Sequence, residues 1–287
     1  MAVSSPTTFL AVHVPKCAGR TIENHFHKHL PDAQCWITQK RFPNLPVSWG
    51  RPYSLRSHEH VKDVKFVSGH QLGHSIADLF PDGNIKRSIL LRDPASFHIS
   101  YYNYRMMRYI AQGWRPYSFE VHLKSLPSDP ICHFILASWC EISWTRLLAM
   151  CPKKKYDTIN RELKNFWYVG DYTNCNELVS LISSELDVPP IAKRANTQKL
   201  WMEQVSWQPL TIDDLQPRTR RELTKRTRLD KAVWTSWAGA RLNAAEVQPV
   251  EFEAAMRSEF PALEAKRIYY SAVRRYQRGW FARSSAS

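Results

Sequence analysis

Short apolar runs alternate along the chain with longer segments in which apolar residues recur every three or four positions. The apolar runs predict buried strands, which we expect at 9–14, 64–70, 86–91 and 166–170. The periodic segments predict helices, which we expect at 21–30, 71–80, 95–110, 118–150, 156–166, 177–186, 211–237 and 250–280. Strands that alternate with helices favour βαβ units, so we expect an α/β fold with a central, mainly parallel sheet flanked by helices.

No internal repeat and no linker divides the chain, so all 287 residues are predicted to form one domain. Its core is expected over about residues 9–237, followed by a helical C-terminal extension over about 238–287. Residues 31–52 contain four prolines and are expected to be irregular. Long irregular segments in compact domains are often functional.

The formal net charge is +14, which indicates an anionic partner such as a nucleotide, an acidic glycan or nucleic acid. The six cysteines form no Cys-x-x-Cys pair, which favours free thiols in a reducing compartment. Neither a signal peptide nor a membrane-spanning segment is visible, so the expected location is the cytoplasm. His70 and His74 have helical spacing, but no third ligand suits them, and we expect no metal.

The first informative junction follows the strand expected at 9–14. The residues after it read Pro-Lys-Cys-Ala-Gly-Arg-Thr over 15–21, and a helix is predicted to begin there. A strand, a tight loop and a helix N-terminus together present backbone N–H groups to an anion, and Lys16 and Thr21 add a charge and a hydroxyl. The order differs from a Walker A loop, because Lys16 precedes Gly19.

The second junction follows the strand expected at 86–91. Arg92, Asp93 and Pro94 come directly after this strand, and Ser100 lies eight residues beyond Arg92, about two turns into the next helix. Ligands of open α/β sheets bind at the carboxyl ends of the strands. A guanidinium at that edge can hold phosphate oxygens through paired hydrogen bonds.

The two junctions together resemble the phosphate-binding motifs of sulfotransferases that use 3′-phosphoadenosine 5′-phosphosulfate (PAPS). The loop Pro-Lys-x-x-Gly-x-Thr is similar to their 5′-phosphosulfate loop, and the segment from Arg92 to Ser100 is similar to their 3′-phosphate motif. Many members carry a second arginine in the latter, where this chain has Phe97 and His98. Gly69-His70 is similar to the carbohydrate-type branch, and weaker similarities occur at 168–171, 194–196 and 229–234.

The resemblance implies a P-loop-NTPase-like three-layer sandwich and transfer of a sulfuryl group from PAPS without a metal. Lys16 would stabilise the leaving phosphate, and His70 would act as general base, with His74 in reserve. A reference pKa near 6.5 suits a histidine for proton abstraction near neutral pH. The residues expected to bind PAPS or its product, 3′,5′-bisphosphoadenosine (PAP), are Lys16, Cys17, Ala18, Gly19, Arg20, Thr21, Arg92, Ser100 and Arg194.

The expected acceptor is a hydroxyl or amine of a carbohydrate or a small metabolite, and the sequence does not choose between them or indicate an oligomeric state. Two alternative functions are compatible with a basic, anion-binding chain. A nucleoside-phosphate kinase would need Walker A order and acidic magnesium ligands after a strand, which the sequence lacks. A basic protein that binds nucleotides or nucleic acid without transferase activity fits the charge, but no nucleic-acid motif is present, so we expect no nucleic-acid partner.

Overall fold

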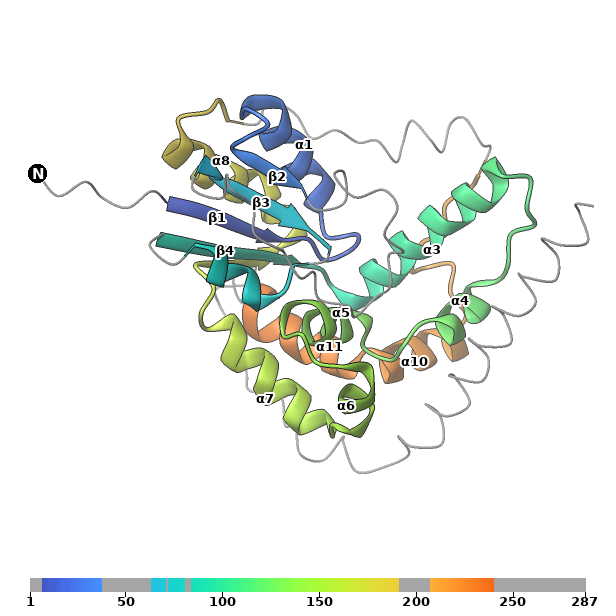
Figure 1. Cartoon of the computed structure of the whole chain (residues 1–287). Coiled ribbons are helices and arrows are strands. Elements are labelled where there is room, and N and C mark those ends of the chain that lie inside the picture. The colour runs from blue at the N-terminus through green and yellow to red at the C-terminus, as the bar shows by residue number, and fades with distance from the viewer. Residues whose placement is uncertain (1–6, 38–62, 71, 81–83, 191–206, 240–287) are drawn as a thin grey trace, which may run out of the picture.

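The computed structural model describes residues 7–37, 63–70, 72–80, 84–190 and 207–239, and it centres on a five-stranded sheet (Figure 1). The strand order is β2-β3-β1-β4-β5, and every neighbouring pair is parallel. The strands are β1 (Thr7–Val12), β2 (Cys35–Ile37), β3 (Phe66–Gly69), β4 (Asn84–Leu91) and β5 (Tyr168–Asp171). The predicted parallel α/β sheet is therefore confirmed. The edge strand β2 lies in the segment that the prolines led us to expect as irregular.

Helices cover both faces of the sheet. In Figure 1, α1 (Gly19–His29) and α8 (Cys175–Leu186) lie on one side, while α7 (Pro152–Leu163) and α11 (Arg228–Trp234) lie on the other. The remaining helical elements are η2 (His74–Leu79), α3 (Pro94–Ala111), α4 (Phe119–Ser125), α5 (Pro130–Phe134), η3 (Ile135–Trp139), α6 (Trp144–Ala149), η4 (Tyr172–Asn174), α10 (Pro217–Arg226) and η5 (Thr235–Gly239). No helix among the described residues combines the length and apolar character needed to span a membrane. The helix expected at 250–280 lies outside the described residues.

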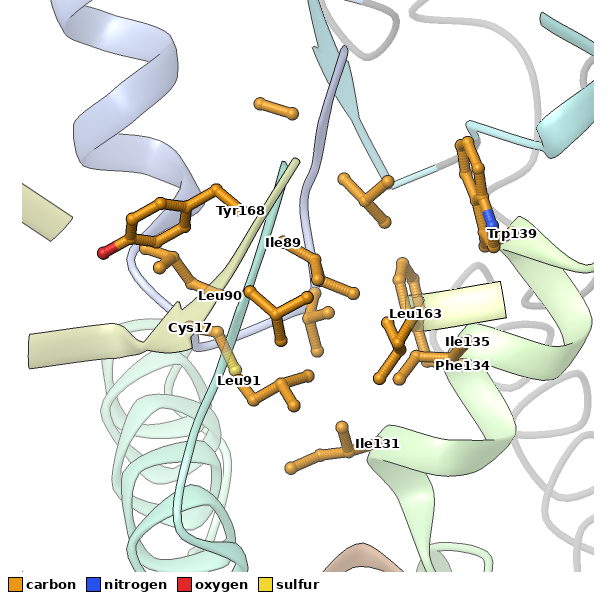
Figure 2. Close-up of a cluster of buried hydrophobic side chains, with 14 of the residues drawn as sticks. Cys17, Ile89, Leu90, Leu91, Ile131, Phe134, Ile135, Trp139, Leu163 and Tyr168 are labelled. Carbon is orange, nitrogen blue, oxygen red and sulfur yellow. The ribbon is translucent and has the colours of Figure 1, made fainter. Parts of the chain in front are cut away.

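Apolar side chains on the sheet supply the core. On β4, Ile89 and Leu91 belong to the same buried cluster as Ile135 and Leu163, and Figure 2 shows this cluster between the sheet and the helices. The strand side chains alternate between faces, so Leu10 enters a second buried cluster with partners from β2, β3 and η2. Burial on both faces explains why these strands read as nearly continuous apolar runs.

The segment 118–150 is not the single helix that we predicted. It divides into α4, α5, a π-helical turn at η3, and α6. Pro127 and Pro130 interrupt it because proline lacks the N–H that a continuous helix requires. Asp129 between them adopts a left-handed conformation, with φ of 53°. The apolar pattern of this segment was read correctly as buried, but its helical continuity was overestimated.

Two buried aspartates join α5 to α11 across a hundred residues of sequence. The Asp230 carboxylate accepts hydrogen bonds from the backbone N–H groups of Ile131 (3.1 Å) and Cys132 (2.7 Å) in the first turn of α5. The Asp129 carboxylate accepts from Leu229 (2.8 Å) and Asp230 (3.1 Å) in the first turn of α11. Each carboxylate thus satisfies donors that begin the other helix. Burial raises the pKa of both groups.

Candidate active site

The loop between β1 and α1 presents backbone donors at a helix N-terminus. Lys16 and Ala18 both adopt left-handed backbone conformations, each with φ of 65°. Such a conformation is uncommon for residues with a Cβ and recurs at ligand-binding sites. The N–H of Thr21 donates to the Ala18 carbonyl at 2.9 Å. Within the described residues, no hydrogen bond uses the N–H groups of Ala18, Gly19 or Arg20, so these three donors are available to an anion.

Gly19 is required in this loop because the ring of His13 occupies the space beside it. A Cβ at this position would lie 2.0 Å from His13 Cδ2, far inside van der Waals contact. The His13 ring is itself fixed, because Nδ1 lies 2.7 Å from Glu23 Oε1 in a buried pair. The Ser68 hydroxyl donates to the same carboxylate oxygen at 3.3 Å. The loop therefore rests on a buried polar network below it.

Glu23 is charged despite its burial. Burial by itself would raise the pKa of this carboxyl group, but the charge of His13 and its hydrogen bond outweigh that effect, and the pKa is lowered. His13, directly after β1, is buried. Its contact with Glu23 also gives the loop an electrostatic anchor.

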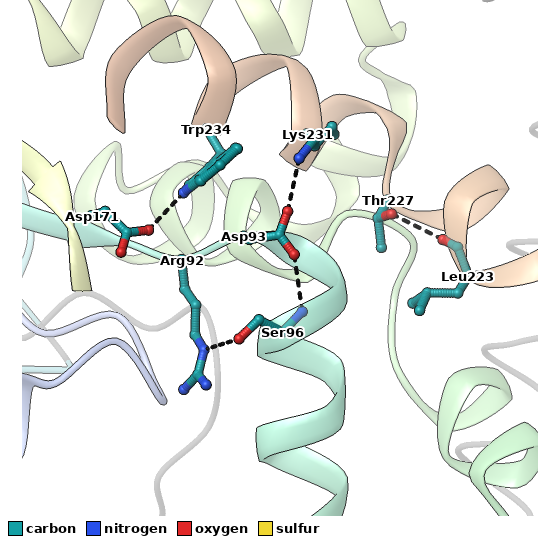
Figure 3. Close-up of polar contacts among 8 residues, drawn as sticks. All are labelled: Arg92, Asp93, Ser96, Asp171, Leu223, Thr227, Lys231 and Trp234. Atoms are coloured by element: carbon teal, nitrogen blue, oxygen red, sulfur yellow. Dashed lines mark hydrogen bonds and ion pairs between the residues drawn. The ribbon is translucent and has the colours of Figure 1, made fainter. Parts of the chain in front are cut away.

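Arg92 connects the second junction to the first. One guanidinium nitrogen, Nη1, donates to the carbonyl oxygen of Lys16 at 3.0 Å, and Nε donates to the hydroxyl of Ser96 at 2.9 Å. The guanidinium lies 4.1 Å from the ring centroid of Tyr172, which follows β5. Figure 3 shows Arg92 reaching from the end of β4 to Ser96 on α3. The arginine is held by loop, helix and aromatic ring together.

Asp93 fixes the start of α3. Its carboxylate accepts the N–H of Ser96 at 3.1 Å as an N-cap and also binds Lys231 Nζ of α11 at 2.8 Å (Figure 3). Two of the weaker sequence similarities also meet nearby, because Trp234 Nε1 donates to Asp171 at 2.8 Å. The carboxyl ends of β4 and β5 are thereby tied to α11.

Lys16 extends from the loop toward α3. Its Nζ lies 4.3 Å from the ring centroid of Tyr104, a cation–π distance. Burial, together with the nearby charge of Arg92, lowers the pKa of Lys16 to about 8. The ammonium group is therefore mostly charged at neutral pH and loses its proton as the pH rises through about 8.

One face of α3 completes the site. Ser96, Ser100 and Tyr104 are each four residues apart, so they follow one another along the same side of the helix. Ser96 contacts Arg92 and Tyr104 contacts Lys16, which places Ser100 on the face between the two contacts. Ser100 is only 7% exposed. Sequence reasoning assigned Ser100 to the phosphate site and did not assign Ser96, Tyr104 or Tyr172 to it.

Phe97 and His98 stand where the resembling family often has a second arginine. Both residues are buried, at 1% and 0% exposure, in the packing behind α3. Burial lowers the pKa of His98 to about 3, so its ring is neutral. The chain therefore supplies no cation from these positions, and Arg92 is the guanidinium of this junction.

His70 lies at the end of β3, next to the loop. Its Nδ1 is 2.5 Å from the backbone carbonyl of His13, and the two imidazole centroids are 3.9 Å apart. Because a carbonyl can only accept, Nδ1 carries the proton and Nε2 keeps its lone pair. Burial, followed by the influence of His13, lowers the pKa of His70 to about 3. This value lies well below the reference pKa on which its expected role as general base was argued.

His74, the reserve base, is placed differently. Its Nδ1 contacts the carbonyl of Trp139 at 3.1 Å and the carboxylate of Glu141 at 3.5 Å. Glu141 also accepts a hydrogen bond from the hydroxyl of Ser75. His74 therefore contacts residues at and just after the end of η3, whereas His70 contacts His13, directly after β1.

The other expected binding residues divide into three groups. Cys17 is buried, its thiol contacts the Pro15 carbonyl at 3.6 Å, and burial raises its pKa, so it serves as a small, protonated loop residue. Arg20 is exposed and Thr21 is half-buried at the start of α1. Arg194 lies outside the described residues. In the part of the chain that the structure describes, no three His, Cys, Asp or Glu side chains gather as metal ligands would.

Comparisons with known proteins add no assignment. The chain matches no model of a known protein family, and no curated protein matches it either. The site must therefore be interpreted from its own residues.

Proposed function

We propose that the chain is a PAPS-dependent sulfotransferase with a P-loop-NTPase-like arrangement of its sheet and loop. The observation that carries the proposal is the hydrogen bond from Arg92 to the Lys16 carbonyl, at 3.0 Å. It brings together two sequence elements that were each interpreted as phosphate-binding, at the carboxyl ends of adjacent strands β1 and β4. PAPS carries phosphate at both the 5′ and 3′ positions, which calls for two such elements.

The residues present suit a doubly phosphorylated nucleotide. The loop offers the N–H groups of Ala18, Gly19 and Arg20, which within the described residues have no other hydrogen bond. Arg92 has five N–H donors, of which the Lys16 carbonyl and the Ser96 hydroxyl use two. Within the described residues its remaining donors form no hydrogen bond, and we assign them, together with Ser100 of α3, to the 3′-phosphate.

In the proposed reaction, the acceptor oxygen or nitrogen bonds to sulfur while the bond from sulfur to the 5′-phosphate oxygen breaks, releasing PAP. Lys16 donates a hydrogen bond to that phosphate oxygen as negative charge develops on it. The loop N–H groups and Thr21 hold the 5′-phosphate in place. Positioning and electrostatic stabilisation carry most of such group transfers.

His70 is proposed to accept the proton that the acceptor loses. Its bond to the His13 carbonyl leaves Nε2 unprotonated, and its low pKa keeps the ring neutral throughout the physiological range. A base of low pKa is always available but accepts protons weakly. The proposal therefore includes Glu23, whose negative charge offsets part of the lowering of the His70 pKa and stabilises the imidazolium that forms.

Titration calorimetry with PAP and with adenosine 5′-phosphate tests the nucleotide assignment. The wild-type protein is expected to bind PAP more tightly, because only PAP carries the 3′-phosphate. Arg92→Ala should weaken PAP by about 10- to 100-fold and remove the preference, since charged hydrogen bonds contribute about 1.5–3 kcal/mol. Arg218→Ala, which removes an exposed cation on α10, is the matched control. Equal binding of the two nucleotides by the wild type would refute the assignment.

Transfer itself requires labelled PAPS and an acceptor panel. Lys16→Ala is expected to abolish transfer while the protein remains folded, as judged by circular dichroism. Substantial transfer by this variant would remove Lys16 from the mechanism.

One observation keeps the nucleic-acid alternative in view. Arg218, Arg221 and Lys225 are exposed on α10 at spacings of three and four residues, which places them on one side of the helix. A salt-dependent DNA shift assay separates the two functions, because nucleic-acid binding would weaken steeply with salt and would not require Lys16. Failure to bind PAP together with tight DNA binding would favour the alternative.

A further inference from the structure

The polar face of α3 continues beyond the phosphate-binding residues. Arg108 lies four residues after Tyr104, so it extends the series formed by Ser96, Ser100 and Tyr104 by one more helical turn. The rise of 1.5 Å per residue makes this face about 18 Å long. Arg92 contacts its first residue, and a second guanidinium stands at its far end.

Tyr104 connects the two halves of this face. Lys16 Nζ lies 4.3 Å from its ring centroid, and Arg108 Cζ lies 5.9 Å from the same centroid. Because both distances meet at one point, the two cations are no more than about 10 Å apart. Arg108 is thus one aromatic ring away from the lysine at which the sulfuryl group would leave.

Arg108 is available for a ligand. The residue is exposed and lies over the Tyr104 ring, and among the described residues it forms no ion pair or hydrogen bond. Arg105, one turn before, is different, because it donates to the Ser125 hydroxyl at 3.3 Å and lies over Tyr101 and Tyr117. Arg108 is therefore the arginine of α3 that is placed near Tyr104 and has no hydrogen-bond partner among the described residues.

A guanidinium supported by an aromatic ring suits a planar anion. Arginine binds carboxylate or sulfate through paired hydrogen bonds, and contact with a ring reduces the freedom it must lose on binding. In the proposed reaction, Lys16, Arg92 and the loop are engaged by the donor phosphates. Arg108 lies outside that set and shares the ring of Tyr104 with Lys16.

We propose that Arg108, supported by Tyr104, binds an anionic group of the acceptor, so that the acceptor carries a carboxylate or sulfate close to the hydroxyl or amine that is modified. This inference rests on the proposed sulfotransferase function and narrows its substrate class. The separation of the two cations fits an anionic group on the reacting ring or on the ring next to it. The anion can belong to an acidic saccharide or to an aromatic acid.

Matched probes distinguish these two sources. Protein saturated with PAP is titrated with hyaluronan tetrasaccharide against neutral chitotetraose, and with 4-hydroxyphenylacetate against 4-methylphenol. The anionic member of at least one pair is expected to bind about 10-fold or more tightly than its neutral partner. Arg108→Ala should remove that preference, and Tyr104→Leu should reduce it. Arg115→Ala is the control, because Arg115 is an exposed cation beyond the helix.

Three results would overturn the inference: no anionic probe binds, the neutral members bind as well as the anionic ones, or Arg115→Ala has the same effect as Arg108→Ala. The last would assign the preference to overall positive charge. PAP binding is measured first on every variant. If the wild type does not bind PAP, the proposed function is wrong. If it binds PAP but does not prefer the anionic probe of either pair, only the role of Arg108 is wrong.

Discussion

Replacement of Gly19 by alanine tests whether the loop depends on the buried network below it. Gly19 is the first residue of α1. In helix interiors, alanine is more favourable than glycine by about 0.5–1 kcal/mol, so helix propensity alone gives no reason for a glycine here. Here the added Cβ would lie 2.0 Å from His13 Cδ2, whereas ordinary contact begins near 3.4 Å. The ring would have to move by about 1.4 Å, although its Nδ1 is held at 2.7 Å from the Glu23 carboxylate.

The expected loss has two levels. Overpacking of a well-filled interior costs about 1–3 kcal/mol in the free energy of unfolding. The loss approaches about 3–5 kcal/mol if the displaced imidazole leaves Glu23 buried and unpaired. The ring of His70, tilted by 40° with its centroid 3.9 Å from that of His13, leaves little room for the His13 ring to adjust. We therefore expect Gly19→Ala to destabilise the protein by at least about 1 kcal/mol and to weaken PAP binding.

Urea denaturation followed by tryptophan fluorescence measures the change, and a double-mutant cycle assigns its cause. His13→Ala removes the obstructing ring, at its own cost in stability. In that background Gly19→Ala should become neutral or stabilising. An undiminished loss in the double variant would show that contact with His13 is not the reason for the glycine, and no loss in the wild-type background would refute the reasoning altogether.

The remaining predictions concern charge. PAP affinity measured across about pH 7 to 9 should fall as pH rises through the pKa of Lys16 near 8, because the neutral amine no longer attracts phosphate; Lys16→Ala should flatten this dependence, and a parallel slope in both proteins would contradict it. His70→Ala should lower turnover far more than PAP affinity, and unchanged turnover would assign the base elsewhere. The raised pKa of Asp129 means that deprotonation opposes folding as pH rises above about 4, so Asp129→Asn should gain stability relative to wild type from acid to neutral pH in urea titrations, and a constant difference would refute this.

The strands could be predicted from sequence because burial on both faces turns each one into a short apolar run. Strand β2 escaped detection because it has only three residues and lies among prolines. Its Trp36 is buried with Leu10 and Val67, a contact between distant segments that periodicity cannot reveal. The division of residues 118–150 into several short helices was not predicted, because the strong apolar pattern of this segment outweighed the signal of its prolines.

The two cationic residues of the candidate site could be predicted from the sequence, but the contacts between them could not. Lys16 and Arg92 each follow a recognisable strand, but the bond from Arg92 to the Lys16 carbonyl depends on β1 and β4 being neighbours. Tyr104 could have been found, because it shares helical spacing with Ser100. The shift in the His70 pKa could not, because it arises from burial and from His13, which follows β1 in a distant part of the sequence.

Asp129 and Asp230 each accept hydrogen bonds from the N–H groups that begin the other helix, so α5 depends on a residue that is synthesised much later. A growing chain completes the donors that begin α5 about a hundred residues before it supplies the carboxylate that satisfies them. Closing a loop of that length costs about 4 kcal/mol of chain entropy, so the contact must form together with other packing rather than before it. The helical layer containing α5 thus cannot reach its final state while only the N-terminal half exists. The contact that completes the start of α5 therefore requires residue 230, which follows every strand that the structure describes.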